Sequence, residues 1–425
     1  MTKKPDAPAI RFKGFSDAWE QRKLGELVDR VVRKNTNNES TLPLTISAQY
    51  GLVDQITYFN NRVASRDVSN YYLVLNGEFA YNKSTSDGYP FGAVKRLDLY
   101  EKGVLSTLYI VFSPKKEQQV DSDFLTVFFD TDRWHKGVAE RAAEGARNHG
   151  LLNISAEDFF DIDLSVPKDV AEQKQIGAFI RQLDNLITLH QRKFEKLTNV
   201  KKSMLEKMFP QNGCSYPEIR FKGFTDAWEQ RKLEDYLTVS AEKNTGNIYG
   251  RSDVLSVSGD YGIVNQIEFQ GRSFAGASVS NYGVVQTGDV VYTKSPLNSN
   301  PYGIIKTNKG KPGIVSTLYA VYHPKENAFS DFIQVYFEQH ARMNNYMHPL
   351  VNKGAKNDMK VSAENALKGP VCFPSRIEQE SISAFFSVLD NLITLHQREL
   401  EKLQNIKKSM LEKMFVYGGT RKWES

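Results

Sequence analysis

The sequence is poor in cysteine and contains no long apolar run. Its 425 residues include two cysteines, Cys214 and Cys372, which lie far apart and form no CxxC pair. A disulfide framework and a cysteine zinc site are therefore not expected, and a reducing compartment fits. The first residues lead into no apolar signal segment, and no stretch of about 18 apolar residues occurs. We expect a soluble cytoplasmic protein.

Excess charge and cofactor motifs are also scarce. The formal net charge of +5 at pH 7 is small for this length, so any nucleic-acid hypothesis has to rest on local features. There is no GxxxxGK[ST] phosphate loop and no GxGxxG after a predicted strand. Asn300-Pro-Tyr302 is similar to part of the (Asp/Asn)-Pro-Pro-(Tyr/Phe) motif of adenine methyltransferases but lacks its second proline. We interpret it as a turn that closes a hairpin and predict no catalytic residue.

The chain has instead an internal duplication with a period of roughly 207 residues. Pro8–Leu24 returns as Pro217–Leu233 with two differences, and Leu183–Arg192 returns unchanged as Leu389–Arg398. Such a period is far longer than the roughly 20–50 residues of solenoid repeats. The sequence therefore indicates a tandem duplication of a whole domain plus a helix.

Between the constant blocks lie two inserts that match only loosely. The inserts, about 25–166 and 234–373, contain short runs of β-branched and aromatic residues separated by Gly, Asn and Asp. These runs predict strands, and a helical stretch follows each set, so we expect an α+β fold with two strand-rich inserts. The predicted order is a first domain with its frame at 1–170, a long helix and linker at 171–212, a second domain at 213–376, a long helix at 377–415 and a tail at 416–425.

Two long helices, 171–209 and 377–415, are predicted from a 3–4 apolar alternation that is sustained for about four heptads. Two copies of one helix can bury their seams against each other, and an antiparallel coiled coil is expected. His190 and His396 fall on the seam, where they either set the register or bind a metal. Lys201-Lys202 and Lys407-Lys408 predict a solvated helix face. The predicted seam residues are Leu183, Ile187, Phe194, Leu197, Met204, Leu389, Ile393, Leu400, Leu403 and Met410.

Candidate DNA contacts come from loops that align between the inserts but differ in sequence. Tyr81–Ser84 aligns with Tyr292–Ser295, where a strand leads into Lys and Ser, side chains that suit phosphate and base-edge contacts. Gly145–Asn148 aligns with Gly354–Asn357, where glycine permits close backbone approach and a basic residue precedes Asn. Ordinary hairpins and strand-to-turn segments remain the alternative for these loops. The candidate DNA-binding residues are Tyr50, Asn82, Lys83, Ser84, Arg147, Asn148, Tyr261, Lys294, Ser295, Lys356 and Asn357.

The doubled order of these features resembles the specificity subunit of type I restriction-modification systems. Each copy has the short frame, a variable insert, a Pro…Glu-Gln…Ile sequence, Leu-Asp-Asn-Leu-Ile and the long helix. The Pro…Glu-Gln…Ile residues are Pro167, Glu172-Gln173 and Ile176 in the first copy and Pro374, Glu378-Gln379 and Ile382 in the second. The resemblance covers nearly the whole chain, and its specificity comes from this order rather than from any one motif.

The resemblance implies that each insert is a target recognition domain that reads one half of a bipartite site in double-stranded DNA. It implies that the paired helices fix the gap and dock two modification subunits, which are adenine methyltransferases, and that restriction subunits with helicase and nuclease activity join them. S-adenosylmethionine, ATP and Mg would then belong to partner subunits, with no cofactor or metal on this chain. The alternative is a non-enzymatic adaptor whose repeated domains bind proteins; a self-sufficient methyltransferase would need the cofactor motif that the sequence lacks.

Overall fold

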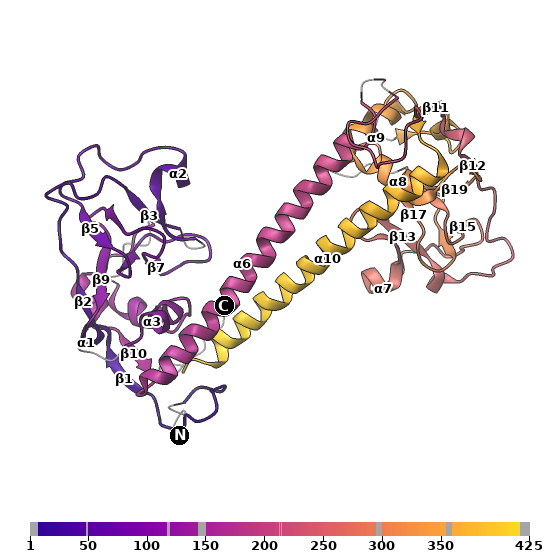
Figure 1. Ribbon diagram of the computed structural model, residues 1–425. Helices are drawn as coiled ribbons and strands as arrows, with labels where there is room; N and C mark the ends of the chain where they lie inside the picture. The colour runs from indigo at the N-terminus through magenta and orange to yellow at the C-terminus, as the bar shows by residue number, and fades with distance from the viewer. Residues whose placement is uncertain are drawn as a thin grey trace. The chain divides into compact units, whose positions relative to one another are not determined.

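The chain forms two compact units with the same architecture (Figure 1). The computed structural model describes residues 7–47, 50–116, 120–142, 150–211, 213, 215–294, 300–353 and 359–416. Unit 1 is Met1–Gln191 with Arg398–Ser425, and unit 2 is Arg192–Gln397. Both boundaries fall inside long helices, α6 (Val170–Lys207) and α10 (Arg376–Lys413). Each unit therefore contains the first half of one long helix and the second half of the other.

The shorter elements follow the same order in both units. Those of unit 1 are β1 (Glu20–Lys23), α1 (Leu24–Leu27), β2 (Val28–Arg30), β3 (Leu44–Ser47), β4 (Gly51–Asp54), α2 (Gln55–Phe59), β5 (Tyr72–Leu75), β6 (Phe79–Asn82), β7 (Ala93–Arg96), β8 (Lys102–Leu105), β9 (Ile110–Pro114), α3 (Ser122–Phe129), α4 (His135–Arg141), α5 (Ala156–Phe160) and β10 (Asp163–Val166). Those of unit 2 are β11 (Glu229–Lys232), η2 (Leu233–Asp235), β12 (Leu237–Val239), η3 (Arg251–Asp253), β13 (Leu255–Ser258), β14 (Gly262–Asn265), α7 (Gln266–Gln270), β15 (Gly283–Val285), β16 (Val290–Thr293), β17 (Ile305–Thr307), β18 (Gly313–Val315), β19 (Tyr319–Pro324), α8 (Ser330–Glu338), α9 (His340–Met347), β20 (Asn352–Lys353), β21 (Met359–Lys360), η4 (Asn365–Leu367) and β22 (Pro370–Phe373).

The sheet topology is also duplicated. Unit 1 has an antiparallel four-stranded sheet in the order β2-β9-β6-β7, and unit 2 repeats it as β12-β19-β16-β17. The two-stranded ladders β1-β10, β3-β4 and β5-β8 return as β11-β22, β13-β14 and β15-β18. The sequence duplication is therefore a duplication of fold, although the inserts match only loosely.

Alternation along the central strand buries both faces of the four-stranded sheet. In unit 1, Phe79 and Tyr81 of β6 enter a large aromatic cluster, whereas Ala80 between them faces a smaller cluster on the other side. Phe79 lies opposite Phe112 of β9 in the strand register, and their rings stack with centroids 5.3 Å apart. This two-sided burial explains why the strands contain continuous apolar runs.

The residues predicted to form the seam of the long helices are buried or half-buried. In unit 1, Leu183 from the first half of α6 shares a cluster with Leu403 and Met410 from the last half of α10. In unit 2, Leu389 from early α10 likewise meets Leu197 and Met204 from late α6. Early segments thus meet late segments, so the two helices run antiparallel, as predicted. The remaining predicted seam residues are half-buried: Ile187, Phe194, Ile393 and Leu400.

Each long helix ends in an aromatic residue that completes a core. Phe415, 2% exposed, follows α10 and packs edge-to-face on Trp19 with centroids 6.1 Å apart in unit 1. Its counterpart Phe209 is fully buried in unit 2 and packs on Trp228 at 5.9 Å. Figure 1 shows the end of α10 beside the start of α6 in unit 1. The short frame thus supplies the tryptophan against which the helix end packs.

The constant Glu-Gln pair holds the short frame to the start of each long helix. Arg11 of the frame donates two hydrogen bonds of 2.6 and 2.7 Å to Glu172, whose side chain is fully buried. Arg220 and Glu378 form the same bidentate pair at 2.8 and 2.7 Å. The hydrogen bond to the Glu172 carboxylate raises the pKa of Arg11. A bidentate pair of this kind fixes the geometry of the frame as well as its position.

Phe415→Ala is expected to destabilise unit 1 by about 3–5 kcal/mol, because the substitution leaves a cavity that the surrounding aromatic rings cannot fill. Urea unfolding followed by circular dichroism measures the loss. Leu189→Ala is the control, since Leu189 is 45% exposed and its removal should change the free energy of unfolding by less than about 0.5 kcal/mol. Equal effects of the two substitutions would contradict this account of the core.

Candidate nucleic-acid interface

The loop after β6 lies beside residues 150–152 of the first insert. Ser84 forms a bridge with Leu151, and the Thr85 N–H donates to the Gly150 carbonyl at 2.7 Å. Arg147 and Asn148 lie outside the described residues, within 143–149. The loop that starts at Ser84 therefore lies beside Gly150 and Leu151, which follow the predicted Gly145–Asn148 loop in the sequence.

The side chains of this loop differ in their exposure and in whether they form hydrogen bonds within the protein. The Asn82 amide oxygen accepts from the Ser84 N–H at 3.0 Å, and Lys83 donates to the Ile154 carbonyl at 3.3 Å. Asn82 and Lys83 are half-buried and Ser84 is exposed. Lys83 thus has a structural partner, and Ser84 is the member most accessible to a ligand.

In unit 2 the structure describes fewer of the predicted contacts. Lys294 is half-buried, and its backbone N–H donates to the Leu318 carbonyl at 3.1 Å. Ser295 lies outside the described residues. Lys356 and Asn357 also lie outside them, in the sequence between β20 and β21.

The tips of two matching hairpins present exposed tyrosines. Tyr50 between β3 and β4 is 63% exposed, and Tyr261 between β13 and β14 is 67% exposed. Each backbone N–H donates at 3.2 Å to a serine hydroxyl at the end of the preceding strand, and a glycine with positive φ follows. The tight turn therefore fixes the backbone and leaves each ring exposed, where it can stack on a base or a sugar, although the Tyr261 ring also lies against Phe269 with centroids 5.3 Å apart.

Sequence reasoning missed further exposed aromatic residues beside these tips. They follow the hairpins in α2 and in or after α7: Tyr58 (47% exposed), Phe59 (50%), Phe269 (46%) and Phe274 (56%). Their backbone is held by a glutamine at the start of each helix, because Gln55 accepts from Ala64 at 2.6 Å and Gln266 accepts from Phe274 at 2.7 Å. The available signal was an aromatic residue at the same insert position in both copies, inside an otherwise polar stretch.

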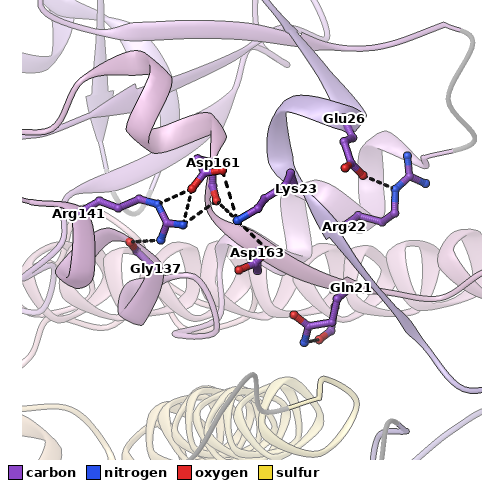
Figure 2. A network of polar contacts seen from close by, with 9 residues as sticks. Gln21, Arg22, Lys23, Glu26, Gly137, Arg141, Asp161 and Asp163 are labelled. Carbon is purple, nitrogen blue, oxygen red and sulfur yellow. Dashed lines mark hydrogen bonds and ion pairs between the residues drawn. The ribbon is translucent and has the colours of Figure 1, made fainter.

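A polar network holds the end of α4 against the residues beside β1 and β10 (Figure 2). Arg141, at the end of α4, donates to the Asp161 carboxylate at 2.6 Å and to the Gly137 carbonyl at 3.2 Å. Lys23 of β1 bridges Asp161 and Asp163 at 3.3 and 3.1 Å. The hydrogen bonds from Arg141 and then Lys23 lower the pKa of Asp161. Figure 2 shows these side chains converging from α4, β1 and β10. The network thus joins the end of α4 to β1 and β10 within unit 1.

The prediction that Lys201 and Lys407 lie on a solvated helix face is wrong. Lys201 is paired with Asp390 at 2.6 Å and with Glu338 at 2.9 Å, and its side chain is 16% exposed. Burial pulls its pKa down, but the two carboxylates outweigh burial and raise the pKa. The pairing was invisible in sequence because the partners lie 137 and 189 residues away. Lys202 and Lys408 are exposed, as predicted.

The same cluster occurs in unit 1. Lys407 pairs with Asp184 at 2.7 Å and with Asp130 at 3.7 Å, and Asp130 in turn pairs with Lys95 of β7 at 2.7 Å. Each cluster therefore connects both long helices to the end of a shorter helix of the insert and onward to the four-stranded sheet, which in unit 2 is reached through Lys306 of β17, 4.0 Å from Glu338. This connection orients the insert relative to the helix pair within its own unit.

Other candidate sites have structural explanations. The Tyr302 carbonyl accepts from the Tyr292 hydroxyl at 2.9 Å, and the Gly303 N–H closes a turn onto Asn300 at 3.0 Å, which agrees with the hairpin interpretation. His190 and His396 are half-buried. Within the described ranges, no group of three His, Cys, Asp or Glu side chains is placed to hold a metal ion. Among the helices described, none is long and apolar enough to cross a membrane.

Comparisons with known proteins agree with the resemblance found in the sequence. Residues 17–199 match the family model described as Type I restriction modification DNA specificity domain. The putative type I restriction enzyme MjaX specificity subunit of Methanocaldococcus jannaschii is 21% identical over 422 residues, which cover 92% of this chain and 92% of the relative. The type I restriction enzyme MjaVIII specificity subunit of the same organism is 22% identical over 411 residues, which cover 92% and 91%.

A solved structure shares the fold. The crystal structure of the type I restriction-modification system S subunit from M. genitalium aligns with a TM-score of 0.57 at 13% identity and covers 96% of this chain and 99% of the other. The predicted α+β architecture, with two strand-rich halves and two paired long helices, is confirmed.

Lys407→Met is expected to cost about 1–3 kcal/mol of unfolding free energy, because it leaves Asp130 and Asp184 near each other without their shared cation. The cost should be below that of a fully buried pair, since Asp184 is 41% exposed. Chemical denaturation measures it. The exposed neighbour provides the control, and Lys408→Met should have an effect below about 0.5 kcal/mol. An equal, small effect of both variants would show that the cluster contributes nothing to the free energy of unfolding.

Proposed function

Because this chain belongs to the DNA specificity subunits of type I restriction-modification systems, a non-catalytic family, we propose that each insert reads one half of a bipartite site in double-stranded DNA. The observation that carries the proposal is that one fold occurs twice with different loops at matching positions. The hairpin tips keep Tyr50 and Tyr261, whereas Ser84–Phe91 and Ser295–Tyr302 differ at most positions. Two such surfaces suit two unlike half-sites.

The proposed contacts fall into two groups. The exposed tyrosines and Ser84 stand on tight turns of unit 1 and unit 2 and would approach bases or sugars. The remaining candidates, Asn82, Lys83, Lys294 and the five residues beyond the described ranges, are assigned to phosphate and base edges on residue type. The division of the chain into two domains, two long helices and a tail, with the bounds given from the sequence, also stays a prediction.

The paired helices are proposed to set the distance between the half-sites. Each helix has 38 residues, which corresponds to about 57 Å at about 1.5 Å per residue. That length exceeds one turn of DNA, about 34–36 Å, so two recognition domains can meet separated half-sites. The antiparallel seam and the charged clusters support a ruler of constant length, because they oppose sliding of one helix along the other.

An exposed apolar stripe on each long helix is proposed to dock one modification subunit. Leu186 and Leu189 of α6 are 44% and 45% exposed, and their counterparts Leu392 and Leu395 of α10 are 38% and 52% exposed. Residues three apart lie on the same side of a helix, so each pair forms a local apolar surface. The two stripes are identical in sequence, which suits two copies of one partner.

We assign the remaining activities to partner subunits. The modification subunits would bring S-adenosylmethionine, and the restriction subunits would bring ATP and Mg. The assembled complex would act on DNA in the cytoplasm. This chain would recognise the DNA and assemble the complex, and its partners would carry out all bond-making and bond-breaking steps.

A chain that contains the first insert twice is expected to recognise a symmetric site. Residues 25–166 would replace 234–373, and the near-identical frames and helices should accept the exchange because their core and charged contacts recur in both units. Sequencing of modified bases in cells with the complex should show two inverted copies of the half-site read by residues 25–166. An unchanged site, or loss of both original half-sites, would contradict independent reading by each insert.

Leu189→Glu is expected to leave a complex with one modification subunit instead of two, because a charge in a buried contact costs affinity by about tenfold or more. Leu189→Glu with Leu395→Glu should abolish assembly. Native mass spectrometry gives the stoichiometry, and circular dichroism checks the fold. Leu99→Glu, at an equally accessible leucine of the insert (61% exposed), is the matched control and should retain both subunits. Full assembly of the double variant would remove the stripe from the interface.

A further inference from the structure

An exposed turn keeps the same sequence in both inserts, which match only loosely overall. Ser106-Thr-Leu-Tyr109 precedes β9, and Ser316-Thr-Leu-Tyr319 occupies the same position at β19. In both copies the tyrosine N–H donates to the serine carbonyl, at 3.2 and 3.1 Å, and closes the same turn. The turn therefore has one sequence and one geometry in two surfaces that otherwise differ.

Contacts within the unit explain why this turn has a serine and a tyrosine, but they do not explain why it has a leucine. The Ser106 hydroxyl accepts from the Leu108 N–H at 3.3 Å, and Tyr109 packs against a core cluster of unit 1. Leu108 is 64% exposed and Leu318 is 62% exposed, so neither needs to be leucine for stability. An exposed apolar residue kept in both inserts indicates a contact with something that both halves meet in the same way.

The position of the leucine points to DNA. In unit 1 the β6–β9 pairing runs to Tyr81 opposite Ile110, which lie two residues from Lys83 and Leu108, and in unit 2 the Leu318 carbonyl accepts directly from the Lys294 N–H. The turn therefore stands beside the loops proposed to reach DNA. Thr107 beside the leucine and Ser84 beside Lys83 are exposed and polar, so the leucine stands near groups that suit contacts with phosphates and base edges.

A contact shared by two unlike half-sites cannot distinguish their base sequences. Isolated apolar side chains such as leucine enter nucleic-acid complexes as wedges that pack between unstacked bases. If the complex methylates an adenine in each half-site, both halves share one requirement, which is that the target base leaves the stack. A wedge can occupy the space that the base vacates, whatever the neighbouring sequence.

We propose that Leu108 and Leu318 are positioning residues that pack into the base stack of their half-sites and stabilise the target adenine outside the helix. The proposal rests on the proposed function and adds a shared, sequence-independent contact to it. Because the leucine acts on the stack and not on base edges, its loss should slow modification without changing which site is read. A target base that is already unpaired should need the leucine much less.

The test uses the complex of the full chain with its modification subunits, S-adenosylmethionine and a duplex that contains the site read by the wild-type complex. Leu108→Ala should slow methylation of one half-site by about tenfold, and Leu318→Ala should slow the other half-site similarly. A duplex with a mismatch opposite the target adenine should restore most of the rate. Leu99→Ala, at another leucine with 61% exposure, should leave both rates unchanged.

Three results would overturn the proposal: no loss of rate in either leucine variant, the same loss on matched and mismatched duplexes, or the same loss in the Leu99 control. Failure of the proposed function would look different, because the wild-type complex itself would then bind and modify no specific site. 2-Aminopurine at the target position gives a second readout. Its fluorescence should rise on binding of the wild-type complex and rise less with Leu108→Ala; an equal rise would also overturn the proposal.

Discussion

The burial of each long-helix end in the core of a compact unit is the constraint on which the rest of the molecule depends. Helix α6 starts in unit 1 and ends with Phe209 in unit 2, whereas α10 starts in unit 2 and ends with Phe415 in unit 1. Because the helix ends are almost identical, both units must offer the same surroundings, in particular the frame tryptophan. This requirement explains why the frames and helices are nearly constant while the loops of the inserts are not.

The charged clusters extend the same constraint to orientation. Lys201 and Lys407 each bridge an aspartate of the opposite long helix and an acidic residue of the insert. A change at one of these positions alone would leave charges without partners in a partly buried site. The exposed loops of the inserts are outside this constraint and differ between the copies, whereas the exposed turn Ser106–Tyr109 recurs unchanged as Ser316–Tyr319.

Periodic features of the fold could be predicted from the sequence, and long-range pairings could not. The 3–4 apolar alternation placed the long helices within two residues of their observed bounds and identified their seam. It could not reveal that Lys201 meets Glu338, because that contact depends on how the insert packs on the helix. The leucine pair at 186 and 189 lies off the seam and carries no periodic signal of its own. Of the candidate site, Tyr50, Ser84 and Tyr261 are exposed as a contact requires, whereas Lys83 also has a structural partner that no local pattern indicated.

The central claim is that one chain presents two similar folds so that two different DNA half-sites are read at a fixed separation. Sequencing of modified bases in a genome that encounters the complete complex tests it most directly, because the motif reports both half-sites and their gap together. The account predicts one motif with two unlike halves, a gap of constant length and a modified adenine in each half. A continuous motif, a gap of varying length or the absence of any modified motif would contradict it.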